Sequence, residues 1–421
     1  MYKRQAQQNS YVTIPRAANS FDNTEIAANV DEDIIDSLTG GRLVGSVTSF
    51  ENFAECPLRY YLRYGVDLKE REEFTFSPVN FGVVLHAVIR EVCDEIKKNG
   101  ESYYLISEEK RREMVKRSVA AITDIYQNSI LKDSSRNSFM IKRMEDLADR
   151  TVWAMGEQLK CGDFVPFVFE HKFNMEVGDG DRKQLMSGTI DRVDICENGT
   201  DVYVRIIDYK TGKKDFNIVK TYYGIDIQLM VYMEAAMKLV AKMRPGKNVI
   251  PAGVFYYNIS DPIVSATTES AEEIEDKIKG ELRLKGMVNS DKDIAEKMDN
   301  TEGTSLNIPV SRKADGGFDS RRSKVMNTEQ FNILGRFVDV RAIDTADRIA
   351  GGDIRRSPYK DGQFSSCDRC PYGAVCGFSV DLPGCNYRKL KKFDDEVLWN
   401  NIKEGVDENG KKMDTGAEER D

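Results

Sequence analysis

Two aspartates and a lysine, Asp191, Asp208 and Lys210, lie on either side of a strong hairpin signal. The signal is Asn198-Gly199 between two apolar runs, which is typical of a two-residue turn joining antiparallel strands. Side chains alternate along a strand, so Asp208 and Lys210 share one face. Two carboxylates brought together across a hairpin can bind one divalent cation, with the lysine amine beside it. The pattern therefore predicts a metal site.

The turn also predicts a strand register. If Asn198-Gly199 form the loop, Glu197 faces Thr200 and Asp191 faces Ile206. Asp208 is then the diagonal neighbour of Asp191, with backbones roughly 7–8 Å apart. The alternative interpretation is a solvated strand face. Val202, Val204, Ile206 and Ile207 argue against it, because they make the strand apolar on both faces. Such a strand belongs inside a sheet, where charges must be paired or must bind something.

A second set of residues with ligand chemistry lies near the C-terminus. Cys367, Cys370 and Cys376 have the spacing C-x2-C-x5-C, and three thiolates so close together can hold a metal ion or an iron–sulfur cluster. The fourth ligand is either Cys385 or Cys56. Proximity in the sequence favours Cys385 and zinc, but spacing does not choose between zinc and a 4Fe-4S cluster. The remaining cysteines are expected to be core residues: Cys93, Cys161 and Cys196.

The composition excludes several classes of protein. The 421 residues are 40% hydrophobic and carry a net charge of −9, which argues against a protein that coats nucleic acid non-specifically but leaves room for a local basic channel. There is no membrane-spanning run and no secretory signal, so we expect a cytoplasmic protein. Eight cysteines there indicate metal or cluster ligation rather than disulfides. Only two histidines are present, which excludes a multi-histidine zinc site.

The elements that would position these residues follow from periodicity. Residues 81–96 predict an amphipathic helix with His86 off its apolar stripe, where a structural hydrogen bond is the commoner role for a lone histidine. A strand over residues 164–177 contains Glu170, and the hairpin of residues 184–210 follows. A helix over 225–240 places Gln228 and Tyr232 one turn apart, and a strand covers 248–259. This order predicts an α/β fold with a small mixed sheet flanked by helices.

The ordered set of motifs resembles the PD-(D/E)XK nucleases of the RecB-like group, and more narrowly the C-terminal nuclease region of AddB-type subunits of helicase–nucleases. The similarity extends over roughly residues 33–405. The motifs that carry it are Cys56-Pro57, Gly82-x3-His86, Gly188-x-Ile-Asp191, Asp208-Tyr-Lys210, Gln228-x3-Tyr232 and the three clustered cysteines.

The resemblance implies a restriction-endonuclease-like core and a role for each matched residue. His86, Asp191 and Asp208 would ligate Mg2+ or Mn2+, and Lys210 would activate the attacking water. Gln228 and Tyr232 would hold the site and contact DNA. A 4Fe-4S cluster would take Cys56, Cys367, Cys370 and Cys376 and staple the two ends of the domain, which leaves Cys385 surplus.

The domain organisation implied by the resemblance has three parts. Residues 1–40 form an irregular leader, expected to be the remnant of a longer chain. Residues 41–390 form the nuclease domain, with a core over about 80–260, a helical insertion over about 265–350 and a cluster-binding segment over 351–390. Residues 391–421 form a C-terminal helix and an acidic tail.

The function implied is Mg2+-dependent 5′–3′ exonuclease action on single-stranded DNA in double-strand-break repair by homologous recombination. The expected partner is an AddA-like helicase subunit, because the sequence has no Gly-x4-Gly-Lys-Ser/Thr phosphate loop and cannot be a motor of that type by itself. Two alternatives stay open. One is a free-standing iron–sulfur nuclease of phage or defence systems, and the other is a non-catalytic DNA-binding scaffold.

Overall fold

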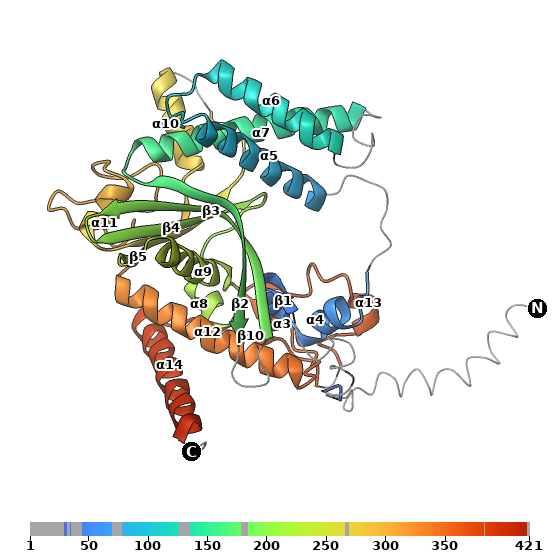
Figure 1. Ribbon diagram of the computed structural model, residues 1–421. Coiled ribbons are helices and arrows are strands. Elements are labelled where there is room, and N and C mark those ends of the chain that lie inside the picture. Colours follow the sequence, from blue (N-terminus) through green and yellow to red (C-terminus); the bar gives the residue numbers. More distant parts are fainter. Residues whose placement is uncertain are drawn as a thin grey trace, which may run out of the picture.

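A twisted mixed sheet runs through the centre of the protein and separates two groups of helices (Figure 1). The computed structural model describes residues 29–31, 34, 44–69, 78–125, 135–177, 184–265, 269–382 and 384–418. The expected leader over 1–40 therefore lies almost entirely outside the described residues. Among the described residues, no helix is long and apolar enough to cross a membrane.

The strands of the sheet lie in the spatial order β1-β3-β4-β5-β6-β7, with β2 pairing on β3. Their neighbours alternate between parallel pairs (β1–β3, β4–β5, β6–β7) and antiparallel pairs (β2–β3, β3–β4, β5–β6). Their bounds are β1 Val44–Ser46, β2 Val165–Val177, β3 Gln184–Asn198, β4 Asp201–Lys210, β5 Asn248–Asn258, β6 Lys285–Asn289 and β7 Val325–Met326. The expected mixed α/β architecture is confirmed.

The β3–β4 hairpin forms as predicted, but its register is two residues away from the prediction. Asn198 pairs with Asp201 and Arg192 with Ile207, so Gly199-Thr200, not Asn198-Gly199, form the loop. Gly199 has φ +61°, a left-handed backbone that glycine adopts easily. It occupies the first position of the loop, which requires this conformation. The ladder ends at Arg192 and Ile207, and this register continued by one residue would set Asp191 opposite Asp208. Because side chains alternate with a period of two, the slip keeps each one on its predicted face.

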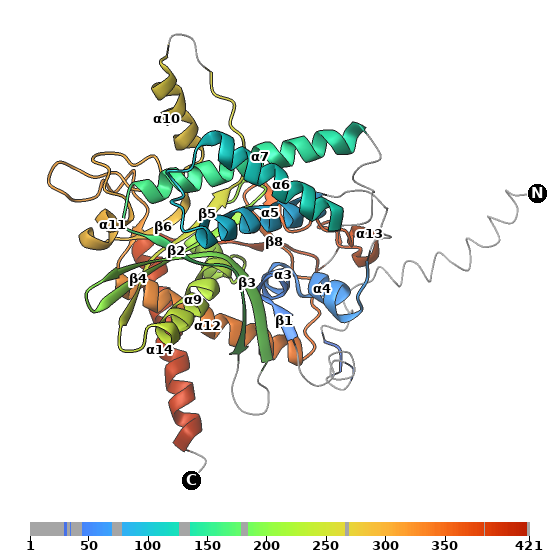
Figure 2. The ribbon, with the colours of Figure 1, turned by 45° about the horizontal axis from the view of Figure 1, so that its top comes forward.

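One face of the sheet is covered by the helices α5 Pro78–Lys98, α6 Glu108–Ile125 and α7 Ser135–Lys160, which lie together in Figure 2. Ile207 and Tyr209 of β4 belong to the core on this side. The other face packs against α9 Gln228–Met243 and α12 Thr328–Ala350, and its core includes Val204 and Ile206. Alternation along β4 therefore builds two cores, and the even-numbered side chains of its C-terminal half face α9.

The segment over 265–350 is not the purely helical insertion that the sequence predicted. It contains α10 Ala271–Glu281 and α11 Lys292–Met298, but β6 and β7 lie within it and extend the main sheet. Both strands are short, and a run of two to five residues carries too little periodicity to be separated from its helical neighbours.

Most of the remaining elements lie near β1 and the cysteine-rich segment, whereas α14 Asp395–Glu418 packs against α12. The others are the helices α3 Val47–Glu55, α4 Pro57–Tyr60, α8 Ile218–Tyr222 and α13 Gly373–Cys376, the π-helical turn η2 Tyr61–Gly65, and a small sheet of β8 Tyr359–Asp361, β9 Phe364–Ser365 and β10 Arg388–Lys389. Figure 1 shows α13 beside α3 and α4, although most of the chain separates α13 from these two consecutive helices in sequence.

Candidate active site

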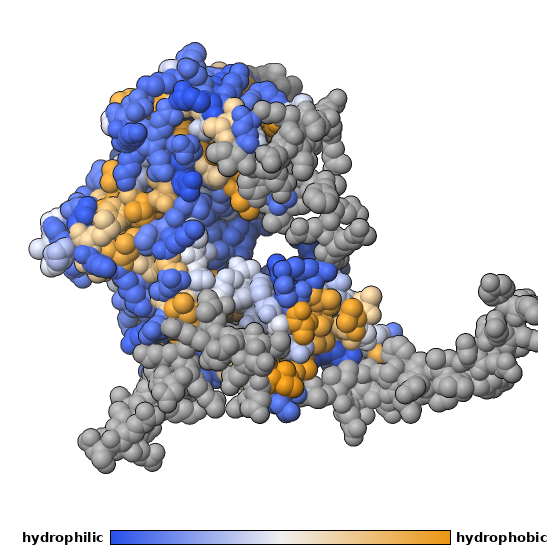
Figure 3. Space-filling model, turned by 45° about the vertical axis from the view of Figure 1, so that its right-hand side comes forward, coloured by the Kyte–Doolittle hydropathy of each residue, from blue (hydrophilic) through white to orange (hydrophobic). Residues whose placement is uncertain are grey.

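Residues from five elements meet where β3 and β4 lie between α5 and α9. His86 comes from α5, Glu170 from β2, Asp191 from β3, Asp208 and Lys210 from β4, and Gln228 and Tyr232 from α9. Figure 3 shows a hollow between the α5–α7 helices and the part of the molecule that carries α3, α4 and α13, and α5 runs along one side of it.

Three of these side chains can hold a metal ion together. The ligand atoms of His86, Glu170 and Asp191 all lie within 4.8 Å of one another. His86 Nδ1 is 3.4 Å from an Asp191 oxygen and 3.8 Å from a Glu170 oxygen. Burial by itself would lower the pKa of His86, but the hydrogen bond to Asp191 and the negative charges of Asp191 and Glu170 raise it. One imidazole and two carboxylates are a ligand set suited to Mn2+ or Mg2+.

Glu170 was not predicted as a site residue. It has φ +47° inside β2, a left-handed conformation that is uncommon for a residue with a side chain. Burial and the neighbouring charge of Asp191 raise the pKa of its carboxyl. The only sequence signal was an acidic residue directly after the apolar run Phe167-Val168-Phe169, which is too weak to assign a role.

The predicted ligand Asp208 lies beside this group rather than within it. Its carboxylate is almost fully buried, and one oxygen is 2.6 Å from Lys210 Nζ. Burial, followed by the charge of Asp191, raises the pKa of Asp208 to about 7. Asp191 in turn accepts a hydrogen bond from the backbone N–H of Tyr209 at 2.7 Å, which joins β3 to β4 between the two aspartates.

Lys210, Gln228 and Tyr232 form one hydrogen-bonded chain. The Lys210 ammonium donates to Gln228 Oε1, and Gln228 Nε2 donates to the Tyr232 hydroxyl, each at 2.9 Å. Gly188 leaves room for the tyrosine, because a Cβ there would lie 3.0 Å from the Tyr232 ring and 2.7 Å from that of Phe173. The helical spacing of Gln228 and Tyr232 thus aligns both side chains behind the lysine.

The four cysteines that the resemblance implied come together around one small pocket. Cys56, Cys367, Cys370 and Cys376 all line it, together with Leu62 and other side chains. Burial raises the pKa of three of these thiols, Cys56, Cys367 and Cys376, and nearby thiolate charges add to the rise. Cys385, which proximity in the sequence had favoured as the fourth ligand, is buried but does not line this pocket. Cys93 and Cys196 are core residues as expected, whereas Cys161 is only half-buried.

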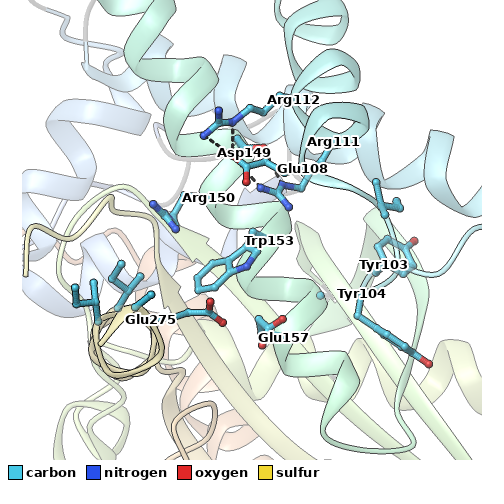
Figure 4. A pocket seen from close by; sticks show the side chains of 15 residues that line it. Tyr103, Tyr104, Glu108, Arg111, Arg112, Asp149, Arg150, Trp153, Glu157 and Glu275 are labelled. Atoms are coloured by element: carbon cyan, nitrogen blue, oxygen red, sulfur yellow. Dashed lines mark hydrogen bonds and ion pairs between the residues drawn. The ribbon is translucent and has the colours of Figure 1, made fainter. Parts of the chain in front are cut away.

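A separate pocket of about 490 Å³ lies between α6, α7 and α10 (Figure 4). Its arginines are already neutralised by partners. Arg111 donates to both oxygens of Asp149, and Arg150 pairs with Asp261 while its guanidinium covers the Trp153 ring at 5.1 Å. No predicted site residue lines this pocket, and we assign no chemistry to it.

The fold and this site define a nuclease class. Residues 45–377 match the model of the PD-(D/E)XK nuclease superfamily, and the chain belongs to that family. The chain is also similar to AddB proteins, each named as one subunit of an ATP-dependent helicase/deoxyribonuclease. It is 34% identical over 399 residues to the one from Lachnoclostridium phytofermentans, with 92% of this chain and 34% of the relative covered. The relatives from Thermoanaerobacter sp. and Clostridium acetobutylicum are 33% and 34% identical, and this chain covers 33% of each, matching with 88% and 89% of its own length. The chain spans about a third of the length of these relatives.

Proposed function

We propose that this chain is the metal-dependent DNA exonuclease domain of a helicase–nuclease that processes double-strand breaks for homologous recombination. The observation that carries the proposal is the convergence of His86, Glu170 and Asp191 beside the Asp208–Lys210 pair. The names of the relatives, which join a helicase to a deoxyribonuclease, support the same function.

His86, Glu170 and Asp191 would hold the divalent cation, and Asp208 would complete the site. A cation bound there would polarise the phosphodiester and lower the pKa of its water. Asp208 fixes the Lys210 ammonium from one side and Gln228 fixes it from the other. An ammonium held in this way faces the negative charge that develops on the scissile phosphate and stabilises it.

The cysteine pocket is suited to a 4Fe-4S cluster ligated by Cys56, Cys367, Cys370 and Cys376. The spacing of the four thiols supports a cluster over a single zinc ion. The four thiols share one pocket, but no three of their sulfurs lie within 4.8 Å of one another. Among the described residues, only His86, Glu170 and Asp191 are gathered that closely. A tetrahedral zinc ion would draw its sulfurs to within about 3.7 Å of each other. The cluster would join the end of α3 to the C-terminal segment and thus hold the two ends of the domain together.

The test is cleavage of end-labelled single-stranded DNA by anaerobically purified protein, with Mg2+ or with EDTA. We expect cutting with Mg2+, none with EDTA, and none from Asp208→Ala or Lys210→Ala variants whose thermal unfolding matches wild type. Activity retained in both variants would overturn the site assignment. Substrates labelled or blocked at one end measure polarity, which we propose to be 5′–3′.

The partner has its own test. We propose that an AddA-like helicase subunit binds this chain and feeds the strand to its site. Co-purification of a helicase subunit with the protein would support this. Degradation of duplex ends by the protein without any helicase would instead support a free-standing nuclease.

A further inference from the structure

The first turn of α9 is capped by a carboxylate from another helix. Glu51 of α3 is only 9% exposed, and its Oε1 accepts the backbone N–H groups of Ile227 and Gln228 at 2.9 and 3.0 Å. The residue at the cap position of α9, Ile227, has no side-chain oxygen to do this. Since the first N–H groups of a helix lack partners within the helix, Glu51 supplies what Ile227 cannot.

The capped residue is also the residue that holds the catalytic lysine. The Gln228 N–H donates to Glu51, while the Gln228 side chain accepts from Lys210 and donates to Tyr232. The backbone position of Gln228 decides where its amide oxygen lies. Glu51 therefore acts on Lys210 through Gln228. Both hydrogen bonds that Glu51 Oε1 accepts come from the backbone at the start of α9.

The helix that carries Glu51 is fixed at both ends. At its start, β1 pairs with β3, and Ser46 caps α3 by accepting the Ser49 N–H at 3.1 Å. At its end the chain meets the cysteine-rich segment, where the Ser366 hydroxyl donates to the Glu55 carbonyl and the Leu58 N–H donates to the Arg355 carbonyl. Glu51 therefore lies on a helix that is anchored to the main sheet at its start and to the cysteine-rich segment at its end.

We infer that Glu51 is a positioning residue for the nuclease site, which it serves by holding Gln228 and thereby the Lys210 ammonium. This inference rests on the proposed nuclease function. A carboxylate is well suited to the task, because the N-terminal end of a helix carries partial positive charge. The competing interpretation is that Glu51 only stabilises the fold.

Three variants separate the two interpretations. Glu51→Ala removes the cap, and Glu51→Gln keeps an oxygen that can accept both N–H groups. Ser270→Ala removes the side-chain cap of α10, far from the site, and is the matched control. For Glu51→Ala we expect kcat per folded molecule to fall ~10- to 100-fold, as for other residues that orient a catalytic group. KM and the affinity for Mn2+ should stay unchanged, because no ligand is removed. Glu51→Gln should restore most of kcat, and Ser270→Ala should leave it unchanged.

Two readouts do not depend on cleavage. Hydrogen exchange of the Ile227 and Gln228 amides and acetylation of the Lys210 amine should both accelerate in Glu51→Ala but not in Glu51→Gln. Unchanged kcat in a folded Glu51→Ala protein, or Lys210 labelling that does not respond, would overturn the inference. Should wild type itself not cleave DNA, the proposed function fails, and exchange with labelling still decides the role of Glu51. If Glu51→Ala does not fold, Glu51→Asp takes its place, because it keeps the charge but shortens the reach.

Discussion

His86 Nδ1 lies 3.4 Å from a carboxylate oxygen of Asp191, although one residue belongs to α5 and the other to β3. The contact brings the helical layer onto the sheet at the point where Glu170 also arrives from β2. A ligand group made from three elements forms only after those elements have packed. The proposed metal chemistry depends on this group.

Glu170→Gln should weaken metal binding. The substitution keeps the shape of the side chain but removes one of the two carboxylates near His86, so we expect the affinity for Mn2+ to fall ~10- to 100-fold. Titration calorimetry measures this directly. Glu176→Gln, on the same strand with an exposed side chain, is the control and should bind as wild type does. Equal affinity in both variants would exclude Glu170 as a ligand.

Tyr232→Phe should lower activity without damaging the fold. The change deletes the hydroxyl that accepts from Gln228 at 2.9 Å and leaves the ring against Phe173, at a centroid distance of 5.6 Å. Loss of one hydrogen bond costs about 1 kcal/mol of stability, so the folded state persists. Steady-state cleavage kinetics should show a lower kcat. A kcat equal to wild type would mean that Gln228 is held without the tyrosine.

Cys56→Ser and Cys385→Ser should behave differently. Cys56 lines the pocket shared by the three clustered cysteines, and Cys385 does not. After anaerobic purification, Cys56→Ser should lose iron, acid-labile sulfide and visible absorbance, and Cys385→Ser should retain them. The reverse outcome would assign the fourth ligand to Cys385. Zinc in place of iron in wild type would contradict the cluster itself.

Asp194→Asn should destabilise the protein severely. Asp194 accepts from Arg192 Nε and Nη2 at 2.7 and 2.6 Å and from Arg205 Nε at 2.9 Å, and all three side chains are buried. Removing the carboxylate leaves two buried cations without compensation, a loss of about 3–5 kcal/mol in the free energy of unfolding. Urea unfolding measures it. The exposed pair Glu197–Arg244 is the comparison, where Glu197→Gln should leave the urea midpoint almost unchanged because water screens the two charges.

The stability of the protein should depend on Asp339 as the pH rises. Burial and a hydrogen bond to Glu234 raise the pKa of Asp339 to about 8 in the folded state, against about 3.9 in the unfolded chain. The folded state therefore binds the proton more tightly, and this contribution to stability is lost as pH rises between those two values. Urea unfolding of Asp339→Asn should show a shallower decline from pH 5 to 8 than wild type. Parallel curves would exclude this carboxyl as the source.

Much of the candidate site could be predicted because it depends on residues that are close together in the sequence. The turn at Gly199 fixes a hairpin, alternation along β4 sets Asp208 and Lys210 on one face, and helical spacing aligns Gln228 with Tyr232. The register was wrong by two residues, yet each face was right, because the period of a strand is itself two. These features depend on neighbours in the chain, and their physical causes are steric and local.

The partners of these residues were decided by the tertiary structure. Glu170 joins His86, Glu51 caps α9, and Cys56 rather than Cys385 meets the other cysteines, each across a large separation in the chain. No periodicity records such contacts, because they arise when strands and helices bury their apolar faces and bring whatever polar groups they carry into reach of one another. The sequence by itself determined the type of fold and most of the residues proposed for the site, Glu170 excepted. The packing of α3, α5 and β2 onto the β3–β4 hairpin decided which side chains surround them.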